Sequence, residues 1–321
     1  MSEKNNKEKF NLFRFFMTKD GKGVSKEDAL NVLEKPNIPN FFKLIRYQFN
    51  RILSVNMFYV FGNFPILFAL FALAGYTSDK VITPASGLYT ALKGTMYFDA
   101  TPVTASLNGI FGIQAQIDVP SVLTYVFYGL ALLVFFTFGI VNVGCTYIVR
   151  NIVRGEPVFV WSDFWYAVKR NLRQGIIFGM IDLFVSVMLV YDLFWFRGNI
   201  GQSGFMSFLY FVSFAMIFMY FFMRMYIYLM MITFDLSLFK LIKNSVFFTI
   251  LGIKRNIMCL IGTALVIALN FMFFMAIMPI GIILPFVVTP ALCSFISVYC
   301  AYPKIKEIMI DPYYSEAADG E

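Results

Sequence analysis

The sequence predicts an all-α membrane protein: a six-span transmembrane helical bundle with amphipathic cytoplasmic interfacial helices and both termini inside. Composition predicts the membrane class. Hydrophobic residues make up 59% of the 321 residues and charged residues 14%, whereas a soluble domain is about half apolar and about a quarter charged. The mean hydropathy is +0.72. The third observation is that basic residues gather in short segments between long apolar runs, which marks those segments as cytoplasmic.

The distribution of positive charge sets the orientation of the bundle. The segment 150–175 between two apolar runs contains several basic residues: Arg150, Arg154, Lys169, Arg170 and Arg173. With both termini inside, all but four of the 26 basic residues fall in cytoplasmic segments, and the reverse orientation would place them outside. The net charge of +7 is explained by this topology, so we expect the lipid bilayer and no nucleic acid as a partner.

The N-terminal part predicts a cytoplasmic tail followed by an interfacial helix. Residues 1–40 are polar and mixed in charge, and no signal-peptide pattern precedes the first apolar run. The stretch 41–51 is amphipathic, with apolar residues near one helical face: Phe41, Phe42, Ile45 and Phe49. This pattern is typical of a helix lying in the membrane interface. The first span, 52–78, follows directly, and Pro65 should bend it.

A long segment outside the membrane, residues 75–120, comes next and carries few charges. Loops of this length are usually functional or have structure of their own. We expect short helices around 88–97 and 106–116, either re-entrant or lying on the bundle. A lid that only covers helix ends is the alternative.

The second span, 121–149, leads into a predicted cytoplasmic helix at 159–174. Ser162 or Asp163 should cap its start. The helix either lies in the interface with its tryptophans at headgroup level, or docks on a partner. The candidate residues for a partner interface on this helix are Trp161, Asp163, Phe164, Trp165, Lys169, Arg170 and Asn171.

The third and fourth spans are predicted at 174–196 and 205–233, and a second cytoplasmic helix at 236–255. The sequence Val168–Leu172 is echoed at Ile253–Ile257, which suggests an internal duplication. The uncharged run that follows would reach about 72 Å as one helix, over twice the thickness of the hydrocarbon core, so it must fold back. Further predictions for this region are a corner at Pro279–Gly281, kinks at Pro285 and Pro290, a membrane domain over 41–306 and an acidic cytoplasmic tail over 307–321.

Ionisable residues within spans are the best candidates for a site, since each costs roughly 2.5–3.5 kcal/mol at mid-membrane. Asp182 and Arg224 fall at similar depths, so we expect an ion pair, with Asn142 nearby. The pair either pins two helices together or lines a polar cavity open to the cytoplasm. Asp192 and Arg197 should form a second pair near the outer end.

Several classes of chemistry are disfavoured by residue content. The chain has no histidine, which removes histidine acid–base chemistry and histidine metal ligands. The four cysteines fall inside apolar runs without a CxxC pair: Cys145, Cys259, Cys293 and Cys300. A disulfide framework or a zinc site is therefore not expected. We expect no enzyme activity, no catalytic residues, no metal and no cofactor.

Three stretches together resemble the YesL-like family of bacterial membrane proteins: FRFFMTKDGKGVSKE, IVRGEPVFVWSDFWYAVKRNLRQG and TFDLSLFKLIKNSVFF. The resemblance covers about residues 13–305. The family is uncharacterised in mechanism, and its genes commonly neighbour carbohydrate ABC-transporter and polysaccharide-degradation genes. The resemblance therefore implies a bacterial plasma membrane protein connected with sugar uptake. The chain departs from the family after the first span, where members have a short Pro-x-x-Thr turn and this chain has the segment 75–120.

Two functions of different classes follow. The first is an accessory or regulatory subunit connected with carbohydrate ABC-type uptake, associated with permease subunits. No nucleotide-binding motif is present, so it could not power transport itself. The second is a small-solute carrier or channel with a cytoplasm-facing polar cavity near Asp182, Arg224 and Asn142. Substrate, partner and oligomeric state stay open at this point.

Overall fold

The computed structural model describes residues 36–312. The contacts of the chain divide it into two units. The bundle unit comprises the described residues up to Asn63 and from Phe135 onward, and the ribbon unit comprises Phe64–Val134. The predicted tails fall largely outside the described part, at residues 1–35 and 313–321.

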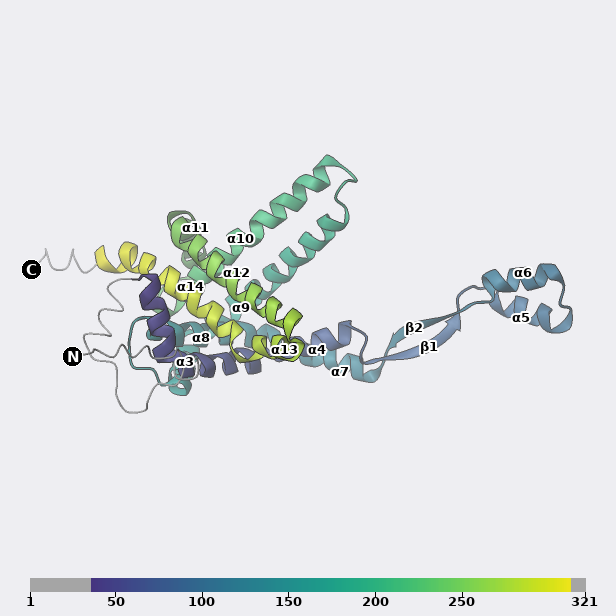
Figure 1. Ribbon diagram of the computed structural model, residues 1–321, viewed down its shortest axis with the longest axis horizontal. Coiled ribbons are helices and arrows are strands. Elements are labelled where there is room, and N and C mark those ends of the chain that lie inside the picture. Colours follow the sequence, from purple (N-terminus) through teal and green to yellow (C-terminus); the bar gives the residue numbers. More distant parts are fainter. Residues whose placement is uncertain (1–35, 313–321) are drawn as a thin grey trace, which may run out of the picture. The chain divides into compact units, whose positions relative to one another are not determined.

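The bundle unit is helical (Figure 1). Its helices are α3 (Ile38–Gly62), α8 (Val134–Val153), α9 (Val160–Gly198), α10 (Gly204–Thr233), α11 (Leu238–Leu251), α12 (Ile253–Ala276), α13 (Met278–Val287) and α14 (Thr289–Ile305), with a π-helical turn at Lys306–Ile310. Two predicted boundaries shift as a result. The first helix already begins inside the predicted N-terminal tail, and helical structure continues into the predicted acidic tail.

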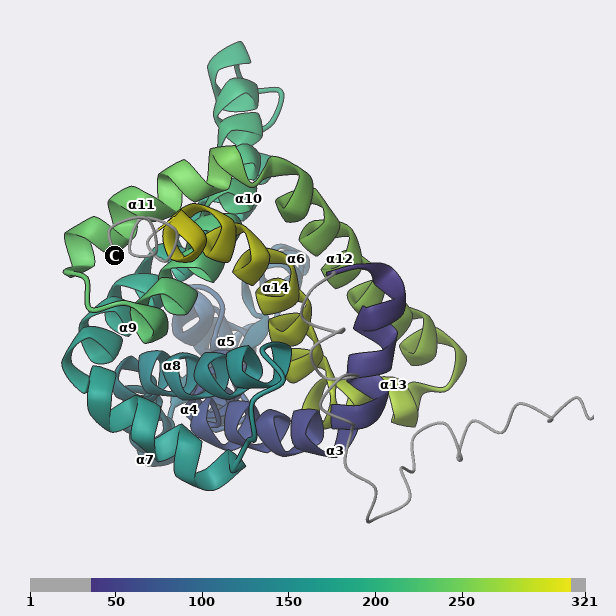
Figure 2. The same ribbon diagram turned by 90° about the vertical axis from the view of Figure 1, so that its left-hand side faces the viewer.

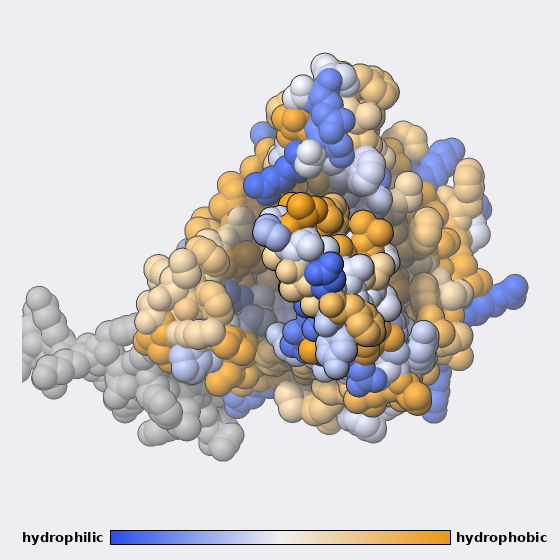
Figure 3. Space-filling model, turned by 90° about the vertical axis from the view of Figure 1, so that its right-hand side faces the viewer, coloured by the Kyte–Doolittle hydropathy of each residue, from blue (hydrophilic) through white to orange (hydrophobic). Residues whose placement is uncertain are grey.

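The helices have the length and composition of a multi-pass membrane protein. Four of them are long and apolar enough to cross a membrane: Val122–Val153, Val160–Gly198, Gly204–Thr233 and Ile253–Ala276. Two broken pairs raise the count to six if each pair is one span: Ile38–Gly62 with Pro65–Leu73, and Met278–Val287 with Thr289–Ile310. Apolar residues cover much of the face shown in Figure 3. The predicted class, an α-helical membrane protein, is confirmed at this level.

Helix α14 lies among α3, α10 and α12 in the bundle unit (Figure 2). Its Phe295 is fully buried, as is Tyr226 of α10. Buried residues of α3 and α8 join the same cluster. The core of the unit therefore sits around the last helix of the chain.

Helices α8 and α9 cross at a contact between glycines. A Cβ atom at Gly139 would collide with the carbonyl oxygen of Gly175, and one at Gly179 would collide with the backbone of Gly139. Gly175 and Gly179 form a G-x-x-x-G pattern, which allows close approach of membrane helices. Asn142 and Asp182 each lie three residues beyond a glycine of this contact, so the crossing brings their helices close at the candidate site.

The predicted cytoplasmic helix 159–174 and third span form one helix, α9, with a kink at Asn171. The Asn171 amide donates to the carbonyl of Ala167 at 3.0 Å. The predicted cap is wrong, because the helix begins at Val160 without a side-chain cap. Asp163 instead lies in the first turn, where its carboxylate accepts the Phe159 N–H at 2.9 Å.

The second cytoplasmic helix, predicted at 236–255, is α11, and it ends at Leu251. The first turn of α12 then contains Asn256, which is fully buried. Its amide donates to the carbonyl of Thr249 at 2.9 Å, across the corner between the two helices. Asn171 and Asn256 hold corresponding places in the echoed sequences, and each binds a carbonyl of the preceding helical segment.

The uncharged C-terminal run folds back after Ala276 and breaks again between α13 and α14. The predicted corner lies within three residues of the observed one. Pro285 falls inside α13 and Pro290 at the start of α14. Asn56 of α3 spans the second break: its amide donates to the carbonyl of Phe286 at 2.6 Å and its oxygen accepts the Ala291 N–H at 3.0 Å.

The ribbon unit contains the only strands in the described part of the chain. Its elements are α4 (Pro65–Leu73), β1 (Ser78–Pro84), α5 (Tyr89–Phe98), α6 (Pro102–Phe111), β2 (Gln114–Pro120) and α7 (Val122–Ala131). The strands pair antiparallel and join the packed pair α4 and α7 to the packed pair α5 and α6 (Figure 1).

The ribbon corrects the all-α prediction for this segment. The first short helix lies within one residue of its predicted position at 88–97, whereas the second begins and ends several residues before 106–116. At the base of the ribbon, Thr124 of α7 donates to the Thr77 carbonyl at 2.7 Å. The second span also differs from its prediction, because α7 ends at Ala131 and α8 begins at Val134.

Candidate polar site in the membrane bundle

The structure brings together the three intramembrane residues singled out from the sequence. Arg224 Nε of α10 lies 2.7 Å from Asp182 Oδ2 and 2.9 Å from Oδ1. Arg224 Nη2 donates to Asn142 Oδ1 of α8 at 3.1 Å. One guanidinium therefore joins three helices.

Two tyrosines that sequence reasoning missed complete the environment of the carboxylate. Tyr220 donates to Asp182 Oδ1 at 2.8 Å and Tyr228 donates to Oδ2 at 2.7 Å. Both lie four residues from Arg224, on the same face of α10, since residues four apart are neighbours on a helix. This Tyr-x₃-Arg-x₃-Tyr spacing is the signal in the sequence that could have identified them.

Burial of the pair is asymmetric. Asp182 is 0% exposed, and its two oxygens accept four hydrogen bonds from Tyr220, Arg224 and Tyr228 and a longer one, at 3.5 Å, from the Ser186 hydroxyl. The Arg224 side chain is 31% exposed. Its Nη1 donates to no other residue in the described part of the chain. The carboxylate is thus fully satisfied while the guanidinium retains free donors.

Arg224 faces a cavity of about 280 Å³. Polar side chains and aromatic rings share the lining: Tyr59, Asn63, Phe138, Asn142, Thr146, Phe221, Tyr228, Ser294 and Ser297. The ring centroids of Phe138 and Tyr228 lie 5.3 and 5.4 Å from the guanidinium carbon, a distance typical of cation–π contacts. The volume and lining suit a small polar solute.

Two interrupted helices end at this cavity. Asn63 caps the end of α3, and Pro290 lies in the first turn of α14. Asn63 Oδ1 is buried and accepts no hydrogen bond from the described residues. Discontinuous helices commonly form the solute sites of transporters, because helix ends present free backbone groups and dipole ends to the solute. The cavity has this construction.

The candidate interface helix divides into buried and accessible residues. Trp161 is 68% exposed and Trp165 is 41% exposed, and Lys169 is also exposed. Phe164 is buried, with its ring stacked on Phe58 at a centroid distance of 4.1 Å.

Phe164 and Asn171 therefore belong to the core of the bundle unit and are not available to a partner. The Asp163 carboxylate accepts the Phe159 N–H at the start of α9. The accessible candidate residues on this helix are Trp161, Trp165, Lys169 and Arg170, the last of which is paired with the exposed Asp235.

Residues of the motifs that carry the family resemblance contact one another through an ion pair and hydrogen bonds. Arg170 forms an ion pair with Asp235 at 3.2 Å, and the Gln174 amide donates to the Leu236 carbonyl at 3.0 Å. Arg150, expected as a cytoplasmic surface charge, is buried and donates to the Ile232 carbonyl at 2.9 Å. These contacts fix the corner between α10 and α11.

The Arg154-Gly155-Glu156 motif is a tight turn after α8. Gly155 has a φ of +68°, a conformation that favours glycine. Arg154 and Glu156 form an ion pair at 2.9 Å. The turn aims the chain from the end of α8 toward the start of α9.

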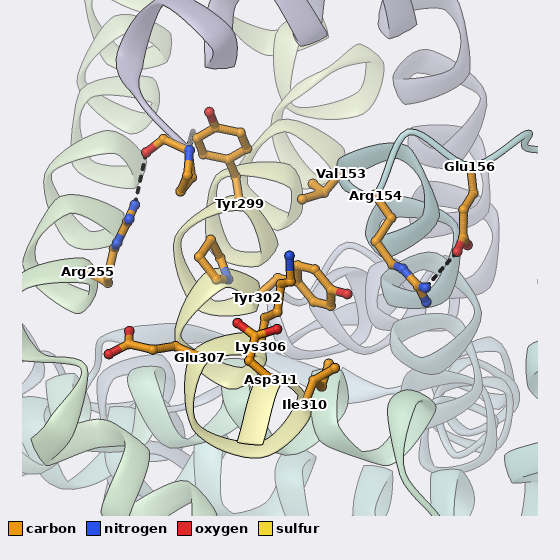
Figure 4. Close-up of a pocket in the computed structure, with 12 residues that line it drawn as sticks. Val153, Arg154, Glu156, Arg255, Tyr299, Tyr302, Lys306, Glu307, Ile310 and Asp311 are labelled. Carbon is orange, nitrogen blue, oxygen red and sulfur yellow. Dashed lines mark hydrogen bonds and ion pairs between the residues drawn. The ribbon is translucent and has the colours of Figure 1, made fainter. Parts of the chain in front are cut away.

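A second cavity, of about 500 Å³, lies near the C-terminal end of α14 (Figure 4). Its lining balances basic and acidic side chains: Arg154, Arg255 and Lys306 with Glu156, Glu307 and Asp311. Arg154 is paired with Glu156, and Arg255 donates to the Pro36 carbonyl at 3.2 Å. Because the basic and acidic side chains of the lining are equal in number, their charge favours neither an anion nor a cation as a ligand.

The remaining expectations for this region concern metal ligands and a second ion pair. Among residues 36–312, no group of three or more cysteine, aspartate or glutamate residues could hold a metal ion. The ion pair expected between Asp192 and Arg197 is not formed. The Asp182–Arg224 pair is therefore the intramembrane ion pair of the described chain.

A family model described as "Protein of unknown function, DUF624" matches residues 121–193. The matched stretch contains Asn142 and Asp182, as well as the whole candidate interface helix. No curated protein and no solved structure matches the chain.

Proposed function

We propose that the chain is a six-span protein of the bacterial plasma membrane, with both termini in the cytoplasm, and that it is related to the YesL-like family. Six spans require each broken helix pair to be one span, which the length and apolar composition of the pairs support. The orientation rests on the basic residues between the spans.

The function that the geometry supports best is the binding of a small polar solute in the Arg224 cavity, as the substrate site of a carrier or channel. The observation that carries this proposal is the unused Nη1 of Arg224, which lines a polar cavity inside the membrane bundle. A purely structural ion pair needs no such cavity. A guanidinium donor that has no partner among the described residues and belongs to a cavity-lining side chain favours a ligand that accepts its hydrogen bond.

The chemistry of the cavity limits the solute. Asp182 neutralises the charge of Arg224 in place, so the cavity does not demand a strong anion. Free guanidinium protons call for a solute that accepts hydrogen bonds, and the hydroxyls of Ser294 and Ser297 in the lining can accept one from a solute that also donates. Hydroxyl groups do both, and the rings of Phe138 and Phe221 offer apolar faces. A monosaccharide-sized polyol fits these requirements.

A thermal-shift experiment tests the proposal. The purified full chain in nanodiscs is heated with a panel of monosaccharides, polyols and small carboxylates, and we expect at least one to raise the melting temperature. Thr146→Leu fills the cavity from α8 and should abolish the shift. Thr263→Leu is the matched control, because Thr263 is similarly buried but does not line the cavity. A panel without any shift, or a shift retained in Thr146→Leu, contradicts the proposal.

A second candidate is an accessory subunit of carbohydrate ABC-type uptake that contacts permease subunits. The observation that favours it is the exposed aromatic and basic face formed by Trp161, Trp165 and Lys169 at the inner surface. Aromatic residues are enriched at protein interfaces. The two candidates are compatible, because the cavity is lined by residues of other helices and by none of α9.

Co-purification tests the accessory role. The tagged chain is extracted from native membranes with a mild detergent, and a permease component should be recovered with it. Trp161→Ala with Lys169→Glu should lose that component, whereas Tyr191→Ala, exposed near the far end of the same helix, should keep it. Recovery of the chain without any permease component counts against this role.

A further inference from the structure

The two-stranded ribbon has one largely apolar face and one mostly polar face, which also exposes Ile82. Side chains alternate between the faces of a strand, and partners across an antiparallel pair share a face. The cross-strand pairs Val81 with Ile117, Thr83 with Ala115 and Asp79 with Val119 therefore share one face. The other face carries the pairs Lys80 with Asp118, Ile82 with Gln116 and Pro84 with Gln114.

The apolar face is not covered within its own unit. Val81 is 41% exposed, Ile117 46% and Val119 38%. Neither α5 nor α6 at the tip contains a buried residue. The tip also leaves large apolar side chains open, among them Tyr97, Phe98, Val103 and Ile110. An antiparallel sheet normally packs its apolar face on a core, and an isolated two-stranded ribbon is only marginally stable in water.

We propose that two copies of the chain associate outside the membrane by packing the apolar faces of their ribbons against each other. Every copy brings the same face, so a two-fold axis makes the surface self-complementary. The centre of the face, around Val81 and Ile117, has no charge that would oppose its own image. Its one charged residue, Asp79, lies near the base of the ribbon, where it remains at the rim.

Charge and backbone arguments favour a second copy over a lipid surface. Elements that lie on membranes carry lysine and arginine on their polar face to meet anionic headgroups. The polar face here has one lysine opposite one aspartate and two glutamines, so it carries no net charge. Both strands are also edge strands with unpaired backbone groups, which hydrocarbon cannot satisfy.

The face is small, and confinement in a membrane lowers the size that association requires. Two sheets pack about 10 Å apart with interdigitated side chains, which would bury Val81, Ile117 and Val119 of both copies. Copies confined to one membrane are already at high effective concentration, so a face smaller than a standard interface in solution can hold them together.

Cysteine crosslinking tests the proposal on the full chain in intact membranes. Ile117→Cys lies on the apolar face, and Gln116→Cys, its neighbour on the polar face, is the matched control. Mild oxidation should convert Ile117→Cys to a species of twice the chain mass on a non-reducing gel, at least fivefold more than Gln116→Cys. The native cysteines are buried or half-buried and set the background. Equal crosslinking of both variants, or of neither, overturns the proposal.

A second measurement separates a second copy from other occupants. The chain is labelled at one site and reconstituted in vesicles at low density, and bleaching steps are counted. Ile117→Asp should shift the population from two steps to one, and Gln116→Asp should leave it unchanged. A single step for the unmodified chain contradicts the proposal, as does quenching of a probe at residue 117 by brominated lipid or recovery of a different protein crosslinked there.

Discussion

Asp182 and Arg224 show how two charges are accommodated in a membrane bundle. An ionised side chain at mid-membrane costs roughly 2.5–3.5 kcal/mol. The cost is offset because two tyrosine hydroxyls and one guanidinium of α10, together with the Ser186 hydroxyl of α9, surround the carboxylate. Removal of one partner of a buried pair leaves the other uncompensated, which typically costs about 3–5 kcal/mol.

A double-mutant cycle should detect this coupling. Asp182→Leu and Arg224→Met should each lower the thermal stability strongly, and the double variant should be more stable than the sum of the two losses predicts, by about 1–3 kcal/mol. Asp192→Leu with Arg197→Met is the control, because these charges on α9 form no ion pair and their effects should add. Unfolding in detergent gives all the values, and an additive first cycle would contradict the coupling.

The pair could be predicted from the sequence because charges inside apolar runs are rare and helical rise converts position into depth. The tyrosines could not be singled out in the same way. The chain contains 18 tyrosines, and an uncharged side chain carries no burial cost large enough to mark it. Only the position of Arg224 between Tyr220 and Tyr228 distinguishes these two, and that clue gains meaning once the partner of Arg224 is known.

At the scale of the elements, the glycine contact between α8 and α9 sets the geometry of the site. Gly139→Ala adds a methyl group where the backbone of α9 already lies, so the helices must separate. Overpacking of this kind typically costs about 1–3 kcal/mol. We expect a lower melting temperature in detergent and loss of the solute-induced shift. Gly129→Ala in α7, where a Cβ meets open space, should change neither quantity, and equal effects would contradict the assignment.

The long helices could be predicted from hydropathy, but the kinks and breaks within them could not. The kink at Asn171 and the corner at Asn256 arise from side-chain amides that bind backbone carbonyls, and an asparagine in sequence does not show which carbonyl it will meet. The strands were missed for a different reason. In Ser78–Pro84 the alternation is broken by Ile82, and in Gln114–Pro120 it spans few residues, so neither run predicts a strand without its partner.

At the scale of the whole molecule, the proposed orientation predicts which lysine positions can be labelled from outside the cell. Lys93→Cys in α5 should react with a membrane-impermeant maleimide in intact cells. Lys169→Cys and Lys254→Cys should react only after the membrane is opened, because the positive-inside arrangement places them in the cytoplasm. All three positions are exposed, so accessibility to water is matched. Labelling of Lys169→Cys from outside would reverse the proposed orientation.

The kink at Asn171 links the segment of α9 that carries Trp161 to the ion pair. Asp182 lies eleven residues further along the same rod, about 16 Å at 1.5 Å per residue. A tilt of about 5° at the joint would carry the carboxylate roughly 1.4 Å over that length. A hydrogen bond of 2.7 Å to Arg224 does not survive such a displacement. A force on Trp161 that tilts the segment beyond Asn171 by this angle would therefore break the ion pair.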